Sequence, residues 1–304
     1  MDFSLIPVEL LFVLTVLANV AFSSFQAVYV KKRLQHNSDY YLLNVGSSLF
    51  CMLALMLLSG FQLQCSAYTL LLGALFGVAT MIASVSRSKA LKVGPWSYTT
   101  VIICASTVFT AISGWLFWQE SLSIWKILGI ILMFFCCCFA IDRQETEKKK
   151  FNLSWLIFCL IAMVCVTLIG IMQKIHQTSK YQGELMPFLV VAFLVSALGS
   201  LAMYFIYRCR EEKIAPTEKK KMDFWRLFLF VSAVYGLATA ANNAINLYLS
   251  GVVDAAIMFP IVNGIPLVLN VALSFVLFKE KLTKKQWIGF ILGFASVVCL
   301  SLGI

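Results

Sequence analysis

The sequence predicts an all-α integral membrane fold, with ten transmembrane helices arranged as two inverted five-helix repeats. The first indication is the composition, because 61% of the 304 residues are hydrophobic and only 12% are charged, whereas a soluble domain is roughly 45–50% apolar. The second is a series of ten apolar segments, each close to the roughly 20 residues that a helix needs to cross a bilayer. The third is an internal repeat that relates the two halves of the chain.

Apolar segments of this length indicate helices, since a strand of a membrane barrel needs only about 9–11 residues. The segments lie at about 8–30, 40–59, 68–91, 95–118, 123–141, 152–174, 185–207, 224–249, 253–278 and 284–303. They divide the chain into a first repeat at 1–141, a linker at 142–151 and a second repeat at 152–304. Because each repeat has an odd number of segments, the second enters the membrane from the opposite side, as in many secondary transporters.

The internal repeat is clearest near the end of each half. Glu120 and Gly129 recur 160 positions later as Glu280 and Gly289, within the pattern aromatic-x-Glu-x-Leu followed by an apolar helix. We interpret both glutamates as structural caps at turns between helices. Two similar four-residue stretches earlier in the halves support the repeat, Gly77 to Thr80 and Gly236 to Thr239.

This repeat resembles the drug/metabolite transporter superfamily, in particular its EamA-type ten-helix members. The stretch from Phe278 to Thr283, followed by Gly289 and Gly293, is similar to the last helical hairpin of that family, and the stretch from Trp118 to Leu122 repeats it. The likeness covers about the whole chain. It implies a transporter, or permease, that moves a small organic metabolite or drug-like solute by alternating access, and not an enzyme.

The basic residues predict which side of the membrane each loop faces. The formal net charge is +10, but Lys and Arg form short clusters between apolar segments, which is typical of membrane topology signals and not of nucleic-acid binding. Alternate loops hold 21 of the 24 basic residues and leave Lys126, Lys174 and Lys180 on the other face. The positive-inside rule therefore places both termini outside the cytoplasm, whereas the family resemblance implies that both lie inside. The expected location is the plasma (cytoplasmic) membrane.

The cysteines and histidines do not suggest a metal site. Most of the 10 cysteines fall inside apolar segments, where thiols behave as small hydrophobic groups, and consecutive helical residues such as Cys136 and Cys137 point about 100° apart. We expect no metal, no cofactor and no catalytic residue. The apolar segments also lack the clustered aspartates with which a membrane transferase would hold Mg²⁺ and diphosphate. A transferase-type enzyme and a lipid flippase nevertheless stay open as alternatives.

Polar side chains within the apolar segments are the best indication of a binding site, since such groups tend to face protein or a water-filled path. They form stripes at helical spacing in the first, third, eighth and ninth segments. We predict that these stripes line a substrate cavity, with Tyr235 beside them: Asn19, Ser23, Gln26, Thr80, Ser84, Tyr235, Thr239, Asn242, Asn243, Asn246, Asn263 and Asn270. The alternative is that each residue only joins two helices by a hydrogen bond.

Two further groups are candidates for mechanical and coupling roles. Pro260 and Pro266 deprive the ninth segment of helical hydrogen bonds and are expected to let it bend during gating, or to leave it statically kinked. Glu9 and Asp254 stand at helix starts, where the helix dipole favours an anion. They are the candidates for coupling to an ion, with helix capping as the alternative.

Other charged, aromatic and small residues leave the ligand and the oligomeric state open. Arg87 and Lys89 belong to a cluster that is expected to reach the lipid headgroups, although it could also meet an anionic substrate. Phe22 and Tyr235 could hold a cation on their ring faces. The spacing Gly73-x-x-x-Gly77 permits close helix packing, either within one chain or in a homodimer.

Overall fold

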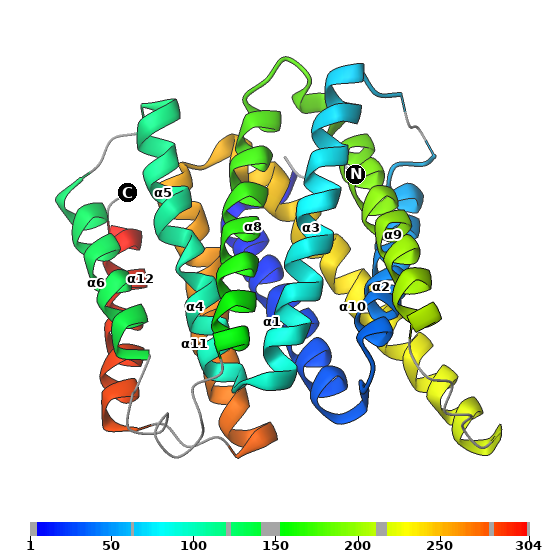
Figure 1. Ribbon diagram of the computed structural model, residues 1–304. Helices are drawn as coiled ribbons and strands as arrows, with labels where there is room; N and C mark the ends of the chain where they lie inside the picture. Colours follow the sequence, from blue (N-terminus) through cyan, green and yellow to red (C-terminus); the bar gives the residue numbers. More distant parts are fainter. Residues whose placement is uncertain are drawn as a thin grey trace.

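The computed structural model describes residues 5–61, 64–119, 123–140, 153–210, 218–279 and 283–302, and within these ranges the regular structure is entirely helical (Figure 1). Eight helical stretches in this part are long and apolar enough to cross a membrane, and two shorter apolar helices cover Ile124–Cys136 and Trp287–Ser296. The predicted all-α membrane fold of ten helices in two inverted repeats is confirmed. Glu120, Glu280 and the linker at 142–151 lie outside the described residues.

The helices follow the predicted segments closely. The first repeat contains α1 (Val8–Arg33), α2 (Asn37–Leu58), α3 (Ala67–Val93), α4 (Trp96–Cys104), α5 (Ser106–Trp118) and α6 (Ile124–Ala140). The second contains α8 (Leu153–Gln177), the short 3₁₀ helix η2 (Gln182–Glu184), α9 (Leu185–Arg210), α10 (Glu218–Val252), α11 (Ala255–Phe278) and α12 (Lys284–Leu302). α10 begins at Glu218, before the predicted start at residue 224, so the helix extends beyond its apolar segment.

The predicted segment at 95–118 is divided in two at Ala105, where α4 ends and α5 begins. No proline or glycine stands at this break. Instead, neighbouring hydroxyls donate to their own backbone: Thr107 to the Cys104 carbonyl, and Thr110 to the Ser106 carbonyl at 3.2 Å. Such bonds compete with the helical ladder and bend helices. The corresponding helix of the second repeat, α11, runs without a break.

Each repeat packs mainly against the other repeat and less against itself. α1 lies against α10, and α3 against α8, so the first helix of each repeat contacts the third helix of the other. α2 packs on α9 and α6 packs on α12, which pairs the second helices and the last helices (Figure 1). The two repeats therefore form one interlocked body.

Gly77 and Gly236, from the two similar stretches noted in the sequence, allow further contacts of this kind. A Cβ atom at Gly77 would lie 2.2 Å from the carbonyl oxygen of Ala192 on α9. A Cβ atom at Gly236 would lie 2.5 Å from the carbonyl oxygen of Ser47 on α2. Because only a hydrogen fits in either place, each glycine lets the third helix of one repeat lie directly on the second helix of the other.

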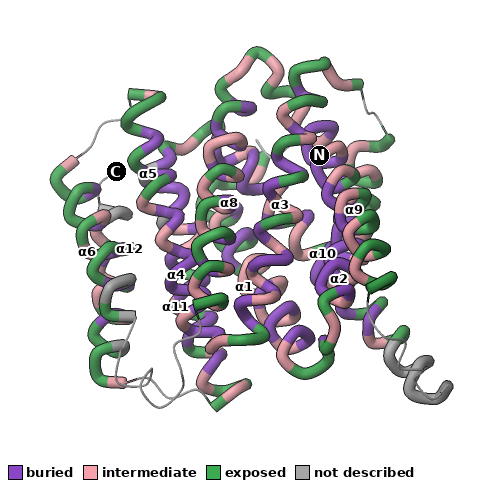
Figure 2. Tube along the Cα trace, viewed as in Figure 1, coloured by how far each residue is buried: buried purple, intermediate pink, exposed green. Residues whose placement is uncertain are grey.

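Buried residues concentrate between the helices, while the outward faces are exposed (Figure 2). Large apolar side chains face outward, as lipid requires; Phe134 is 61% exposed and Phe294 56%. The buried interior also contains hydrogen bonds between α2 and α9, where Asn44 Nδ2 donates to Ser196 Oγ at 3.1 Å and to Ser200 Oγ at 2.7 Å. These bonds join two helices to each other, so some buried polar residues of this protein serve helix packing.

Candidate functional site

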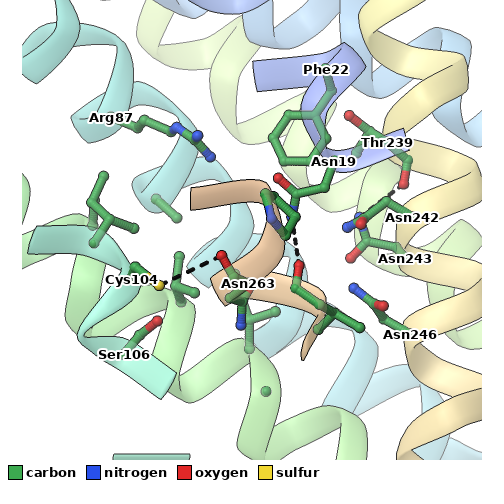
Figure 3. A pocket seen from close by; sticks show the side chains of 18 of the residues that line it. Asn19, Phe22, Arg87, Cys104, Ser106, Thr239, Asn242, Asn243, Asn246 and Asn263 are labelled. Carbon is green, nitrogen blue, oxygen red and sulfur yellow. Dashed lines mark hydrogen bonds between the residues drawn. The ribbon is translucent and has the colours of Figure 1, made fainter. Parts of the chain in front are cut away.

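A cavity of about 1150 Å³, counting the part that is open to solvent, lies between helices of both repeats. Side chains from α1, α3, α4, α5, α8, α10 and α11 form its wall (Figure 3). The structure places these predicted residues on that wall: Asn19, Gln26, Thr80, Ser84, Tyr235, Thr239, Asn242, Asn243, Asn246, Asn263 and Asn270. The remaining predicted residue, Ser23, lies behind the wall, fully buried, and donates to Asn270 Oδ1 at 2.7 Å.

Three of the asparagines use their side-chain oxygens to hold α1. Thr15 Oγ1 on α1 lies 3.0 Å from Asn242 Oδ1 and 2.8 Å from Asn246 Oδ1, so the Thr15 hydroxyl donates a bifurcated hydrogen bond to the two oxygens. Asn270 Oδ1 accepts from Ser23 in the same way. Within the described part of the chain, the amide nitrogens of Asn242, Asn246 and Asn270 make no hydrogen bond. These nitrogens are donors that a molecule in the cavity could use.

Three other amides are oriented the opposite way. Asn243 Nδ2 donates to the Thr239 carbonyl at 2.9 Å, and Gln26 Nε2 donates to Ser88 Oγ at 2.9 Å. Asn19 Nδ2 donates to the Val262 carbonyl at 3.3 Å. Their oxygens have no partner among the described residues. Those of Asn19 and Asn243 are acceptors for a molecule in the cavity, whereas Gln26 Oε1 is buried. Joining helices and lining a cavity are therefore not exclusive roles, since Asn19, Asn242, Asn246 and Asn270 each bond to another helix with one end of the amide and leave the other end without a partner among the described residues.

The bond from Asn19 compensates for a proline. Pro266 has no N–H, so the carbonyl four residues earlier, that of Val262, loses its helical partner. Asn19 supplies the missing donor from α1. This explains how α11 continues through Pro266 without a break. Pro266 is buried on the cavity wall, whereas the side chain of Pro260 lies outside the description, and a gating role for either proline stays a prediction.

The two coupling candidates lie away from the cavity. Glu9 is exposed in the first turn of α1. Asp254 precedes α11 without a side-chain capping bond, and its side chain is 49% exposed. Its Oδ2 atom lies 3.4 Å from the Nζ atom of Lys126, whose own side chain is only 2% exposed. Neither carboxylate lines the cavity, so ion coupling through them also stays a prediction.

The cavity wall also includes residues outside the predicted polar stripes, among them Phe22, Arg87, Thr100, Cys104, Thr110, Gln173 and Phe259. Arg87 matters most, because its side chain points into the cavity (Figure 3). The expectation that it reaches the lipid headgroups is wrong, and the alternative, contact with an anionic substrate, stays a prediction. A signal for this was present. Thr80, Ser84 and Arg87 stand at i, i+4 and i+7 and so share one face of α3.

Comparison with known proteins agrees with this architecture. The sequence model described as the EamA-like transporter family matches residues 10–141 and 153–302. A solved structure, described only as the crystal structure of a protein, is similar with a TM-score of 0.68 and 11% identity over 97% of each chain, which shows the fold alone. A search of curated proteins finds no match. Because the family match covers both halves, the chain belongs to the EamA-like transporter family, within the drug/metabolite transporter superfamily.

Proposed function

We propose that the protein is a secondary transporter that moves a small organic metabolite or drug-like solute across the plasma membrane through the central cavity. The observation that carries this proposal is a group of amide side chains from both repeats around one cavity. One end of each amide forms a hydrogen bond within the protein, and the other end has no partner among the described residues. A polar group removed from water is unfavourable until it is hydrogen-bonded. A solute with hydrogen-bonding groups would satisfy the remaining amide ends, which is how a site can select a polar molecule within the membrane.

The proposed transport cycle is alternating access. It is supported by the inverted repeats, since in such transporters the substrate site lies between the repeats. It is also supported by a difference between corresponding helices: the fourth span is broken at Ala105, whereas α11 is continuous. An exchange of these two shapes between the repeats would open the cavity to the opposite side of the membrane.

Coupling to an ion is assigned to Asp254 or Glu9 as part of the same proposal. Asp254 would act through its ion pair with Lys126, which joins the start of α11 to α6. The test is gradient-driven transport by Asp254→Asn and Glu9→Gln in proteoliposomes. Loss of gradient dependence in one variant, with counterflow intact, supports coupling at that carboxylate; full gradient dependence in both shows that coupling lies elsewhere.

Counterflow in proteoliposomes tests the transport proposal. Protein reconstituted in vesicles should exchange particular members of a panel of radiolabelled metabolites. Asn243→Ala and Asn263→Ala should lower this exchange without lowering the yield of folded protein, because both residues line the cavity. Asn44→Ala is the matched control: it removes an amide that joins α2 to α9, so it should lower the yield and leave transport per folded molecule unchanged.

Two results would overturn the proposal. Movement of labelled lipid without solute exchange would identify a flippase, and formation of a product from the solutes would identify an enzyme. If Asn243→Ala and Asn263→Ala lowered only the yield, these amides would serve helix packing and not solute binding.

A further inference from the structure

Arg87 carries the only charged side chain among the described residues that line the cavity. Its Nε atom is buried and has no hydrogen-bond partner. In the described part of the chain, no carboxylate pairs with its guanidinium. The contact that the structure does give it is with the ring of Phe22, whose centroid lies 5.4 Å from the guanidinium carbon. A group with five planar N–H donors is thus held against an aromatic face with its charge uncompensated.

The neighbouring basic residues of α3 behave differently. Lys89 Nζ lies 5.4 Å from the ring centroid of Tyr41 and 5.5 Å from that of Tyr207, among the aromatic side chains of α2 and α9. Lys92 Nζ donates to the Lys31 carbonyl at 3.5 Å, near the end of α1. Neither lysine lines the cavity. Among these three cations, the side chain of Arg87 alone is directed toward a possible ligand.

The opposite wall is suited to the same kind of ligand. Figure 3 shows Arg87 across the cavity from the asparagines of α10, which include Asn242 and Asn246. Their oxygens are held by Thr15, so they offer N–H groups to the cavity. Donors therefore stand on both sides of the space, beside the acceptor Asn243 Oδ1 on the α10 wall. A cationic ligand would be repelled by Arg87, and the Phe22 ring face that could have held it is already occupied by the guanidinium.

We propose that the solute is a small organic anion whose carboxylate binds Arg87, an inference that rests on the proposed transport function. A guanidinium fork matches a carboxylate with two parallel hydrogen bonds, and the ionic pair compensates a charge that is unfavourable inside the membrane. The acceptor groups at the far end of the anion bind the N–H groups of Asn242 and Asn246. Phe22 and Tyr235, which stack at 5.9 Å between centroids, supply an apolar side.

Thermal unfolding of the purified protein tests this with matched probes. Each carboxylate is compared with its uncharged amide: nicotinate with nicotinamide, lactate with lactamide, and benzoate with benzamide. Glycerol phosphate beside glycerol asks whether a phosphate serves equally well. A ligand raises the Tm according to its affinity for the folded state. We expect at least one acid to stabilise the wild type and its amide to do so much more weakly.

Three variants identify the residue responsible. Arg87→Gln should weaken binding of that acid about 10- to 100-fold, the loss expected for hydrogen bonds to a charged group, and should weaken binding of the amide much less. Arg87→Lys keeps the charge without the fork and should fall between. Lys92→Gln removes the same charge from the same helix, outside the cavity, and should bind the acid as the wild type does.

The outcomes separate this inference from the transport proposal. Equal stabilisation by acids and amides, stabilisation by neutral probes only, or stabilisation by none of the probes would overturn the anion site. An acid preference that survives in Arg87→Gln would overturn it too. Should Arg87→Gln fail to fold, the wild-type preference for the acid and its reduction in Arg87→Lys decide the question. Counterflow of neutral solutes alone would support the transport proposal and overturn the anion site. Binding of an acid without counterflow of any solute would support the anion site and overturn the transport proposal.

Discussion

The bond between Asn19 and the Val262 carbonyl gives a sharp test of how α11 tolerates a proline. In the wild type, this carbonyl has lost its helical partner to Pro266 and accepts from Asn19 Nδ2 at 3.3 Å. Asn19→Ala should therefore cost about 1–2 kcal/mol of stability, because a neutral hydrogen bond is lost and a carbonyl is left unsatisfied. In a Pro266→Ala background, residue 266 supplies its own N–H to Val262. Asn19→Ala should there cost only about 0.5 kcal/mol.

A double-mutant cycle on the purified protein measures the difference, with unfolding followed in a denaturing detergent. The expected coupling between the two positions is about 1 kcal/mol. Asn243→Ala is the control amide, since its Nδ2 bonds to the Thr239 carbonyl on its own helix, and it should show no coupling to Pro266→Ala. Equal costs of Asn19→Ala in both backgrounds would refute the compensation. In that case α11 would satisfy Val262 by another route.

Three other changes test the packing and the orientation. Gly77→Ala should destabilise the protein by about 1–3 kcal/mol, since the new Cβ would meet the Ala192 carbonyl. The control Gly183→Ala, with no atom within 4 Å of its Cβ, should have almost no effect. Similar melting temperatures of the two variants would contradict the close contact at Gly77. Ser296→Ala removes a 2.6 Å hydrogen bond from Ser296 Oγ on α12 to the Gly129 carbonyl on α6. It should lower the free energy of unfolding by about 0.6–1.7 kcal/mol and leave counterflow intact. An unchanged melting curve would show that this bond adds no stability. With the accessible Cys65 and Cys209 both replaced by Ser, Lys32→Cys should be labelled by an impermeant maleimide only after permeabilisation if the basic face is cytoplasmic. Labelling of intact cells would favour the reverse orientation.

Most of the fold could be predicted because membrane helices are recognised in a sequence by the length and apolar composition of their segments. The break at Ala105 could not. The hydroxyls of Thr107 and Thr110 bond to the local backbone there, but Thr80 and Thr239 make the same kind of bond within unbroken helices. Such residues therefore do not mark a break in the sequence. Conversely, the proline at 266 suggested a bend that α11 does not require, because the compensating donor, Asn19, is far away in the sequence.

The candidate site was visible as polar stripes, since a 3.6-residue period puts such residues on one face. Two kinds of residue escaped. Ser23 belongs to the same stripe but lies behind the cavity wall, where it bonds to Asn270 of α11. Its position depends on how closely α1 packs against α11, which the sequence does not give. Arg87 was grouped with Lys89 by proximity in the chain, although its spacing from Thr80 and Ser84 placed it with the cavity. Asn44 shows the opposite limit, because a buried amide can bond to a neighbouring helix and lie outside the cavity wall.

The crosswise packing of the repeats has a consequence for how the chain is made. Gly77 emerges from the ribosome well before Ala192, and at about 5–20 residues per second the delay is on the order of ten seconds. During this time the contact face of α3 has no α9 to cover it, and Asn44 has no serine to bind. The first repeat must therefore wait in the bilayer, or beside the insertion machinery, as an incomplete intermediate. Synthesised as two separate chains, the repeats should accumulate only when both are present in the same cell.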